Sequence, residues 1–148
     1  MASDEAPRGQ LILVEDDPAS RGVLALLFEA AGWKVAEAAD GRGGLTLARR
    51  LAPDVVVTDL RMPGMSGIEL AVELQGCLGS LPVVAITSDR ASLREAALRS
   101  GLFAEVLVKP LAPGPLLEAV LRASRGAGGA ARGEKSRGPA RGRSGAGD

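Results

Sequence analysis

The sequence contains no histidine among its 148 residues, and only 2% of them are aromatic. Without histidine the chain cannot build a His-ligated metal site, a Ser-His-Asp or Cys-His catalytic centre, or a phosphohistidine of its own. With two Phe, one Trp and no Tyr, stacking of nucleic-acid bases on aromatic side chains is nearly excluded. Cys77 is the single cysteine, which excludes a disulfide framework and a multi-thiolate zinc site within one chain. The chemistry left to this chain is that of carboxylates, hydroxyls, lysine and arginine.

Long uncharged hydrophobic runs are missing as well. Glu29 interrupts the longest candidate, residues 23–33, and no stretch approaches the roughly 18 apolar residues of a membrane span. The acidic N-terminus lacks the apolar core of a secretory signal. We therefore expect a cytoplasmic protein.

The formal net charge of zero conceals two parts of opposite charge. Residues 1–123 carry 12 basic and 16 acidic residues, whereas residues 124–148 carry 6 basic and 2 acidic residues. The second part is rich in Arg, Gly and Ala and has almost no large apolar residue to offset the entropy of ordering. We expect a flexible N-terminus (1–8), one domain (9–124) and a disordered basic tail (125–148). The tail could bind nucleic acid in a salt-dependent way, but it lacks interleaved aromatic residues, and we favour a solvated tail.

Two kinds of apolar segment alternate along the domain. Short, nearly continuous β-branched runs predict strands at residues 11–14, 55–58 and 82–87, and weaker strand candidates lie at residues 34–38 and 105–108. Apolar residues at helical spacing predict helices at residues 17–32, 40–51, 66–78, 92–101 and 113–125. Asp17 is expected to cap the first helix, and Ser92 with Glu95 to form a capping box that opens the fourth. The alternation predicts an α/β fold with one doubly wound parallel sheet and helices on both faces.

Polar residues stand where the predicted strands end. These are Glu15-Asp16-Asp17, Asp59, Thr87-Ser88 and Lys109-Pro110, and in a parallel sheet they open onto one edge. Clustered carboxylates repel one another unless a cation holds them, and an all-oxygen site favours a hard ion such as Mg²⁺. Carboxylate, Mg²⁺, ammonium and hydroxyl are together the groups that a transferring phosphoryl group needs.

Four segments carry a specific pattern: Leu11-Ile-Leu-Val-Glu-Asp-Asp17, Asp59-Leu-Arg-Met-Pro-Gly-Met-Ser-Gly67, Ala85-Ile-Thr87 and Val108-Lys-Pro110. In order and spacing, over roughly residues 9–124, they resemble the receiver domain of two-component response regulators. The resemblance implies a flavodoxin-like (βα)5 fold, and the strand order 2-1-3-4-5 is taken from that class.

Position by position, the resemblance implies a phosphoacceptor and a metal site. Asp59 matches the nucleophile that becomes an aspartyl phosphate and that also faces the metal. Asp16 matches the direct Mg²⁺ ligand, Glu15 the acidic neighbour that acts through a metal-bound water, and the backbone carbonyl of Arg61 the third protein ligand.

The resemblance also implies a switch. Lys109 matches the lysine that contacts the carboxylate and the phosphoryl oxygen, and Thr87 the hydroxyl that moves toward the phosphate. Pro110 matches the proline, often cis, that aims the lysine. The family commonly has Tyr or Phe three residues before the lysine, where this chain has Val106; Phe103 could take that place only if the strand register shifted.

The leading hypothesis is a stand-alone response regulator, a phosphoacceptor signalling protein rather than an enzyme. A histidine kinase or phosphotransfer protein would donate the phosphoryl group, and a downstream protein would bind the face of the fourth helix, fifth strand and fifth helix. The alternative is an interaction module or scaffold that works without phosphorylation, which Val106 favours. A small nucleotide-binding enzyme is disfavoured, because the loop Glu15-Asp-Asp-Pro18 offers no glycine-rich cradle for a diphosphate.

Overall fold

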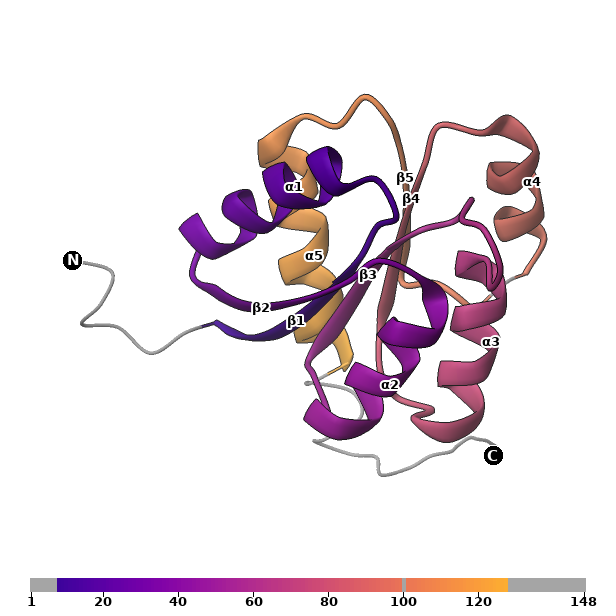
Figure 1. Cartoon of the computed structure of the whole chain (residues 1–148), viewed down its shortest axis with the longest axis horizontal. Coiled ribbons are helices and arrows are strands. Elements are labelled where there is room, and N and C mark those ends of the chain that lie inside the picture. The colour runs from indigo at the N-terminus through magenta and orange to yellow at the C-terminus, as the bar shows by residue number, and fades with distance from the viewer. Residues whose placement is uncertain (1–7, 100, 128–148) are drawn as a thin grey trace.

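The sheet consists of five parallel strands in the order β2-β1-β3-β4-β5. The computed structural model describes residues 8–99 and 101–127. Within them the elements alternate (Figure 1) as β1 Gly9–Val14, α1 Pro18–Ala30, β2 Trp33–Ala38, α2 Gly41–Leu51, β3 Val55–Asp59, α3 Gly67–Cys77, β4 Val83–Thr87, α4 Arg90–Leu98, β5 Glu105–Val108 and α5 Pro113–Ala127. The predicted α/β, flavodoxin-like fold with strand order 2-1-3-4-5 is confirmed.

The two faces of the sheet are covered by different helices (Figure 1). Leu11 and Leu13 of β1 pack in one cluster with residues of α1 and α5. Ile12 and Val14 point the other way and pack with residues of α2 and α3. Because successive residues of a strand face opposite sides, burial of both faces requires apolar residues in succession. This is the physical reason for the continuous apolar runs in the sequence.

Side-chain caps fix where the first three helices begin. Asp17 accepts a hydrogen bond from the backbone N–H of Ser20 (2.8 Å) at the start of α1, as predicted. Asp40 does the same for Gly43 at the start of α2. Ser66 and Glu69 form a reciprocal capping box at the start of α3. Each cap therefore sets the point at which a loop from the sheet turns into a helix.

Two sequence predictions about the helices were wrong. The fourth helix begins at Arg90 and is capped by Asp89, so Ser92 lies inside its first turn and does not open a capping box. Helical spacing in the sequence predicts that Val23 belongs to the buried stripe of α1, but Val23 is 67% exposed and Ala25 is buried in its place. Both helices were thus predicted correctly, but the first residue of α4 and one residue of the buried face of α1 were not.

The described residues continue past the range 9–124 at both ends. The backbone N–H of Arg8 donates to the carbonyl of Gly32 (2.8 Å), and α5 continues to Ala127. The rest of the predicted flexible N-terminus and of the predicted disordered tail, residues 1–7 and 128–148, lies outside the described residues. In the described part of the chain, no helix has the length and hydrophobicity required to cross a bilayer.

Candidate functional site

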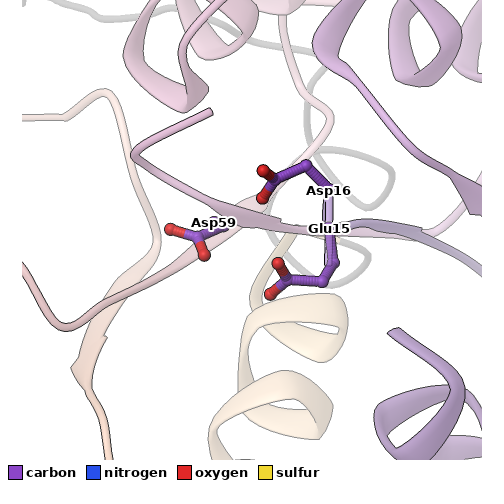
Figure 2. Close-up of side chains that lie close together, drawn as sticks. All are labelled: Glu15, Asp16 and Asp59. Carbon is purple, nitrogen blue, oxygen red and sulfur yellow. The ribbon is translucent and has the colours of Figure 1, made fainter. Parts of the chain in front are cut away.

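The carboxyl edge of the sheet gathers charged residues from three strand ends. Glu15 follows the last residue of β1, Asp59 is the last residue of β3, and Lys109 follows the last residue of β5. Figure 2 shows that the side chains of Glu15, Asp16 and Asp59 reach into a common space from the ends of β1 and β3. The three carboxylates have oxygen atoms that all lie within 4.8 Å of one another.

Lys109 connects the two buried carboxylates of this cluster. Its Nζ lies 3.0 Å from Oδ2 of Asp59 and 3.3 Å from Oε1 of Glu15. The backbone N–H of Lys109 donates to the carbonyl of Thr87 (2.9 Å), and its peptide bond to Pro110 is cis. The backbone of the lysine is thus held by the sheet. Its ammonium group lies between Asp59, which is 50 positions away in the sequence, and Glu15, which is 94 positions away.

Burial makes the electrostatics of this cluster strong. Glu15 is 2% exposed and Asp59 8% exposed, whereas Asp16 lies on the surface. Burial raises the pKa of Glu15, although the backbone N–H of Asp17 and the charge of Lys109 act in the opposite direction. Burial also acts to lower the pKa of Lys109, but the hydrogen bond and charge of Asp59, with those of Glu15, outweigh it and hold the pKa above its ordinary value. Lys109 is therefore a fixed positive charge at neutral pH.

The cluster has the donors that a hard divalent cation prefers. Its three carboxylates face one ammonium group, which leaves two negative charges unbalanced when all three are ionised. The donor atoms are oxygens, without sulfur or imidazole nitrogen, and Mg²⁺ and Ca²⁺ bind to such sets. The residues present therefore fit a metal site of Glu15, Asp16 and Asp59.

Asp17 has a different role from its two acidic neighbours. Its carboxylate accepts from the backbone N–H of Ser20 as the cap of α1, and this hydrogen bond lowers the pKa of Asp17. Its backbone N–H donates to Oε2 of Glu15 (3.1 Å), which holds the Glu15 carboxylate in place. The structural interpretation of Asp17 as a helix cap is confirmed.

Thr87 and Arg61 lie beside Asp59 without joining the carboxylate cluster. Asp59 pairs with Ile86, so Thr87 lies one residue further along the neighbouring strand. Its hydroxyl is buried and accepts from the backbone N–H of Asp89 (3.0 Å). The backbone N–H of Arg61 donates to Oδ1 of Asp59 (3.1 Å), while its guanidinium reaches outward to Asp89 (3.2 Å). The role of the Arg61 carbonyl as a metal ligand stays a prediction.

Gly67 is packed directly against the backbone that carries Asp59. Its N–H donates to the carbonyl of Leu60 (2.9 Å). A Cβ at this position would lie 2.8 Å from the Cα of Leu60 and closer still to the carbonyl oxygen of Asp59. The glycine at the end of the Asp59–Gly67 motif is thus required by the close approach of α3 to the end of β3.

Sequence reasoning missed two residues that support the site. Arg21 donates from Nη1 to the carbonyl of Glu15 (2.8 Å) and pairs with Glu37 through Nε (3.5 Å). The signal for Arg21 was its position on the face of α1 that buries Leu24 and Phe28. Asp89 caps α4, and the signal for it was its place just before a helix, where an acidic residue is a typical N-cap.

The strand register leaves Val106 at the position where the family commonly has an aromatic residue. Val106 lies within β5 and pairs with Ala85. Phe103 lies before β5 and packs against the apolar clusters beneath α3 and α4. The register shift that would bring Phe103 into that position does not occur.

A family model described as the response regulator receiver domain matches residues 11–121. Among curated relatives, the chain is 39% identical over 115 residues to the C4-dicarboxylate transport transcriptional regulatory protein DctD of Pseudomonas aeruginosa, covering 77% of this chain. It spans only 25% of the length of DctD and 39% of the length of the probable transcriptional regulatory protein TcrX of Mycobacterium tuberculosis.

Other similar proteins are covered almost end to end. The chain is 36% identical over 113 residues to an uncharacterized 14.6 kDa protein of Leptolyngbya boryana, covering 74% of this chain and 86% of that protein. Among solved structures, the chemotaxis response regulator CheY4 of Vibrio cholerae superposes with a TM-score of 0.69 at 27% identity, covering 77% of this chain and 97% of that one.

Proposed function

The chain belongs to the family of response regulator receiver domains, and on that premise we propose that it accepts a phosphoryl group on Asp59. Receiver domains are phosphoacceptor modules of two-component signalling and not classical enzymes. One observation carries the assignment to Asp59: its buried carboxylate lies at a strand end, 3.0 Å from the Lys109 ammonium group and beside two further carboxylates.

In the proposed reaction a carboxylate oxygen of Asp59 forms a bond to phosphorus, and the bond from phosphorus to the donor's leaving atom breaks. The leaving group departs with the bonding electrons and takes up a proton. Lys109 holds its positive charge beside Asp59, where it balances charge on the phosphoryl oxygens. The backbone N–H of Arg61 orients the carboxylate through Oδ1. Water later hydrolyses the acyl phosphate and restores the carboxylate.

Mg²⁺ is the proposed metal, held by Asp16, Asp59, Glu15 and the backbone carbonyl of Arg61. The all-oxygen donor set and the unbalanced negative charge support this assignment. When bound, the ion supplies positive charge to the phosphoryl oxygens. Thr87 is proposed to turn its hydroxyl toward the phosphoryl group, since it ends the strand next to Asp59.

The proposed partners follow from the composition and from the exposed surface. The chain contains no histidine, so a histidine kinase or phosphotransfer protein is the proposed donor. A downstream protein is proposed to bind the face of α4, β5 and α5, where Leu98 is 80% and Val108 51% exposed. We further propose that the chain acts in the cytoplasm as a single-domain regulator.

Labelling with acetyl phosphate tests the proposal. The full chain, incubated with acetyl phosphate and Mg²⁺, should gain the mass of one phosphoryl group in intact-mass spectra, and EDTA should prevent the gain. Asp59→Asn should abolish it. Asp40→Asn is the matched control, because it neutralises a carboxylate that caps α2 and replaces it with another good cap. Labelling that persists in Asp59→Asn would overturn the assignment.

The scaffold alternative is favoured by one observation, the presence of Val106 at the aromatic position of the switch. It is tested by capturing binding partners with wild-type protein phosphorylated by acetyl phosphate and, in parallel, with Asp59→Asn. Partner binding that is equal in the two proteins would support the scaffold, and binding that depends on labelling would support the regulator.

A further inference from the structure

Arg21 of α1 holds the backbone on both sides of Asp16. Its guanidinium donates from Nη1 to the carbonyl of Glu15 (2.8 Å), the residue before Asp16. Its backbone N–H donates to the carbonyl of Asp17 (2.9 Å), the residue after Asp16. One residue of the helix thus fixes the short connection between β1 and α1 that carries Asp16.

The side chain of Arg21 is in turn held by β2. Its Nε lies 3.5 Å from Oε1 of Glu37, and the side chain is 21% exposed. The backbone N–H of Glu15 also donates to β2, at the carbonyl of Ala38 (3.1 Å). Because the guanidinium group is a rigid planar fork, it loses little freedom for each hydrogen bond that it makes. The peptide group between Glu15 and Asp16 therefore has a fixed orientation.

The direction of the Asp16 carboxylate depends on this backbone. Among the described residues, no hydrogen bond or ion pair holds the Asp16 side chain, whereas the Glu15 carboxylate is held by Lys109 and by the N–H of Asp17. Figure 2 shows the Asp16 carboxylate extending from the end of β1 toward Asp59. A change in the peptide before Asp16 would move this carboxylate, and no side-chain contact would oppose the movement.

We infer that Arg21 is a positioning residue that makes the acidic cluster selective for Mg²⁺ over Ca²⁺. This inference rests on the metal site proposed above. Mg²⁺ demands near-ideal octahedral geometry with short bonds, whereas Ca²⁺ accepts a larger and more flexible set of oxygens. Loss of the Arg21 side chain frees the Asp16 carboxylate, so it should reduce the affinity for Mg²⁺ far more than the affinity for Ca²⁺.

The charge of Arg21 acts in the opposite direction. A guanidinium group close to the cluster repels a divalent cation, so removal of the charge alone would raise the affinity for both ions. Coulomb repulsion acts equally on two ions of the same charge and leaves the selectivity between them unchanged. An effect of position is therefore recognised by a loss of affinity that is larger for Mg²⁺ than for Ca²⁺.

Titration of the full chain with each ion alone tests the inference. The Kd values for Mg²⁺ and Ca²⁺ are measured by calorimetry at a temperature where circular dichroism shows every variant to be folded. Arg21→Met should weaken Mg²⁺ binding about tenfold, because groups that orient metal ligands contribute about 10- to 100-fold to affinity. It should weaken Ca²⁺ binding by no more than about twofold, because Ca²⁺ tolerates displaced ligands.

Two milder variants keep the test valid if Arg21→Met folds poorly. Arg21→Lys keeps the charge but lacks the fork that reaches both the Glu15 carbonyl and Glu37, so it should also lose Mg²⁺ affinity. Glu37→Gln leaves Arg21 in place with a weaker anchor on β2 and should show a smaller loss, again larger for Mg²⁺ than for Ca²⁺.

Arg122→Met is the matched control. It removes the same group from another ion pair between a helix and a strand, that of Arg122 in α5 with Glu105 (3.0 Å). Glu105 is the first residue of β5 and therefore lies at the opposite edge of the sheet from the acidic cluster. Both Kd values should equal those of the wild type, and a loss of selectivity in Arg122→Met would overturn the role of Arg21.

The possible failures are distinguishable. In Arg21→Met, unchanged Kd values, or Kd values that change equally for the two ions, would overturn the inference and leave the metal site standing. A wild type that binds Ca²⁺ more tightly than Mg²⁺ would also overturn it. Absence of saturable Mg²⁺ binding by the wild type would overturn the proposed metal site, and this inference with it.

Discussion

Replacing Gly67 with alanine should damage both the stability and the chemistry of this protein, although Gly67 carries no functional group. Gly67 is the first residue of α3, and the Cβ of an alanine there would meet backbone rather than side-chain atoms. Those atoms are the Cα of Leu60 at 2.8 Å, the carbonyl carbon of Asp59 at 3.0 Å and, closer still, the carbonyl oxygen of Asp59. Backbone atoms at a strand end cannot rotate away, so either α3 or the end of β3 must shift.

The magnitude follows from the size of this overlap. Overpacking by one methyl group costs about 1–3 kcal/mol where neighbours can adjust, and the backbone contact places Gly67 at the upper end of that range. The gain in helix propensity offsets less than about 1 kcal/mol, because the first position of a helix benefits least. A net loss of about 2 kcal/mol lowers the Tm of a domain of this size by roughly 10 °C.

The same shift should slow phosphorylation, because the clash involves the backbone of Asp59, the residue that is proposed to accept the phosphoryl group. A displacement of about 1 Å at a reacting group can slow a reaction on the order of 100-fold. We expect Gly67→Ala to gain the phosphoryl mass from acetyl phosphate far more slowly than the wild type. The measurement is made well below the Tm of the variant, so that the folded protein is compared in both cases.

Gly76 provides the matched control, since it lies in the same helix and has no atom within 4 Å of its hypothetical Cβ. Gly76→Ala should raise stability by about 0.5–1 kcal/mol and leave the labelling rate unchanged. A Gly67→Ala variant with wild-type Tm would refute the packing argument. A destabilised variant that labels at the wild-type rate would refute the claim that Gly67 positions Asp59.

Other expected results concern the metal and the charges. Mg²⁺ should raise the Tm of the wild type, by the equivalent of about 2.7 kcal/mol at a hundred times its Kd, and Asp16→Asn should lose most of this rise; an unchanged rise would place the ion elsewhere. In EDTA near neutral pH, Glu15→Gln should raise the Tm, because burial raises the pKa of Glu15 and its ionised form therefore opposes folding. This gain should disappear as the pH falls below the ordinary value of 4.5, where Glu15 is protonated in both states, and a gain that persists there would exclude an electrostatic origin. Lys109→Met should lower the Tm at neutral pH, since contacts with Asp59 overcome the effect of burial and hold the pKa of Lys109 above 10.5. The loss should shrink as the pH rises through the raised pKa of Lys109 in the wild type; a constant loss would indicate packing instead.

The strands and the residues at their ends could be predicted because their physical causes are local. Burial on both faces demands continuous apolar runs, and the polar residues that follow such runs must meet at one edge of a parallel sheet. Glu15, Asp59 and Lys109 meet at this edge, and Lys109 contacts both carboxylates there. The role of Asp17 could be predicted for the same reason, because a capping residue followed by a proline indicates the start of a helix within a few residues of sequence.

The remaining features depend on relations that no short window contains. The Arg61–Asp89 ion pair joins two loops 28 positions apart, and its formation depends on how α4 is set against the sheet. The start of α4 was mispredicted because Asp89 and Ser92 are both good caps, and only the position of the preceding strand end selects the first. Val23 was misplaced because one apolar residue more or less hardly changes the periodicity of α1.

The three acidic residues after β1 show that the number of acidic residues in a segment does not predict which changes the protein tolerates there. Glu15 turns inward to Lys109, Asp16 stays at the surface of the cluster, and Asp17 closes the first turn of α1. Three neighbouring acidic residues thus have three different surroundings, and the number of residues between β1 and α1 determines which residue occupies which place. Removing one residue from this connection would keep most of its acidity and yet assign each carboxylate to the wrong neighbour. In a library of variants, the length of this link should therefore be held constant while its individual charges are sampled.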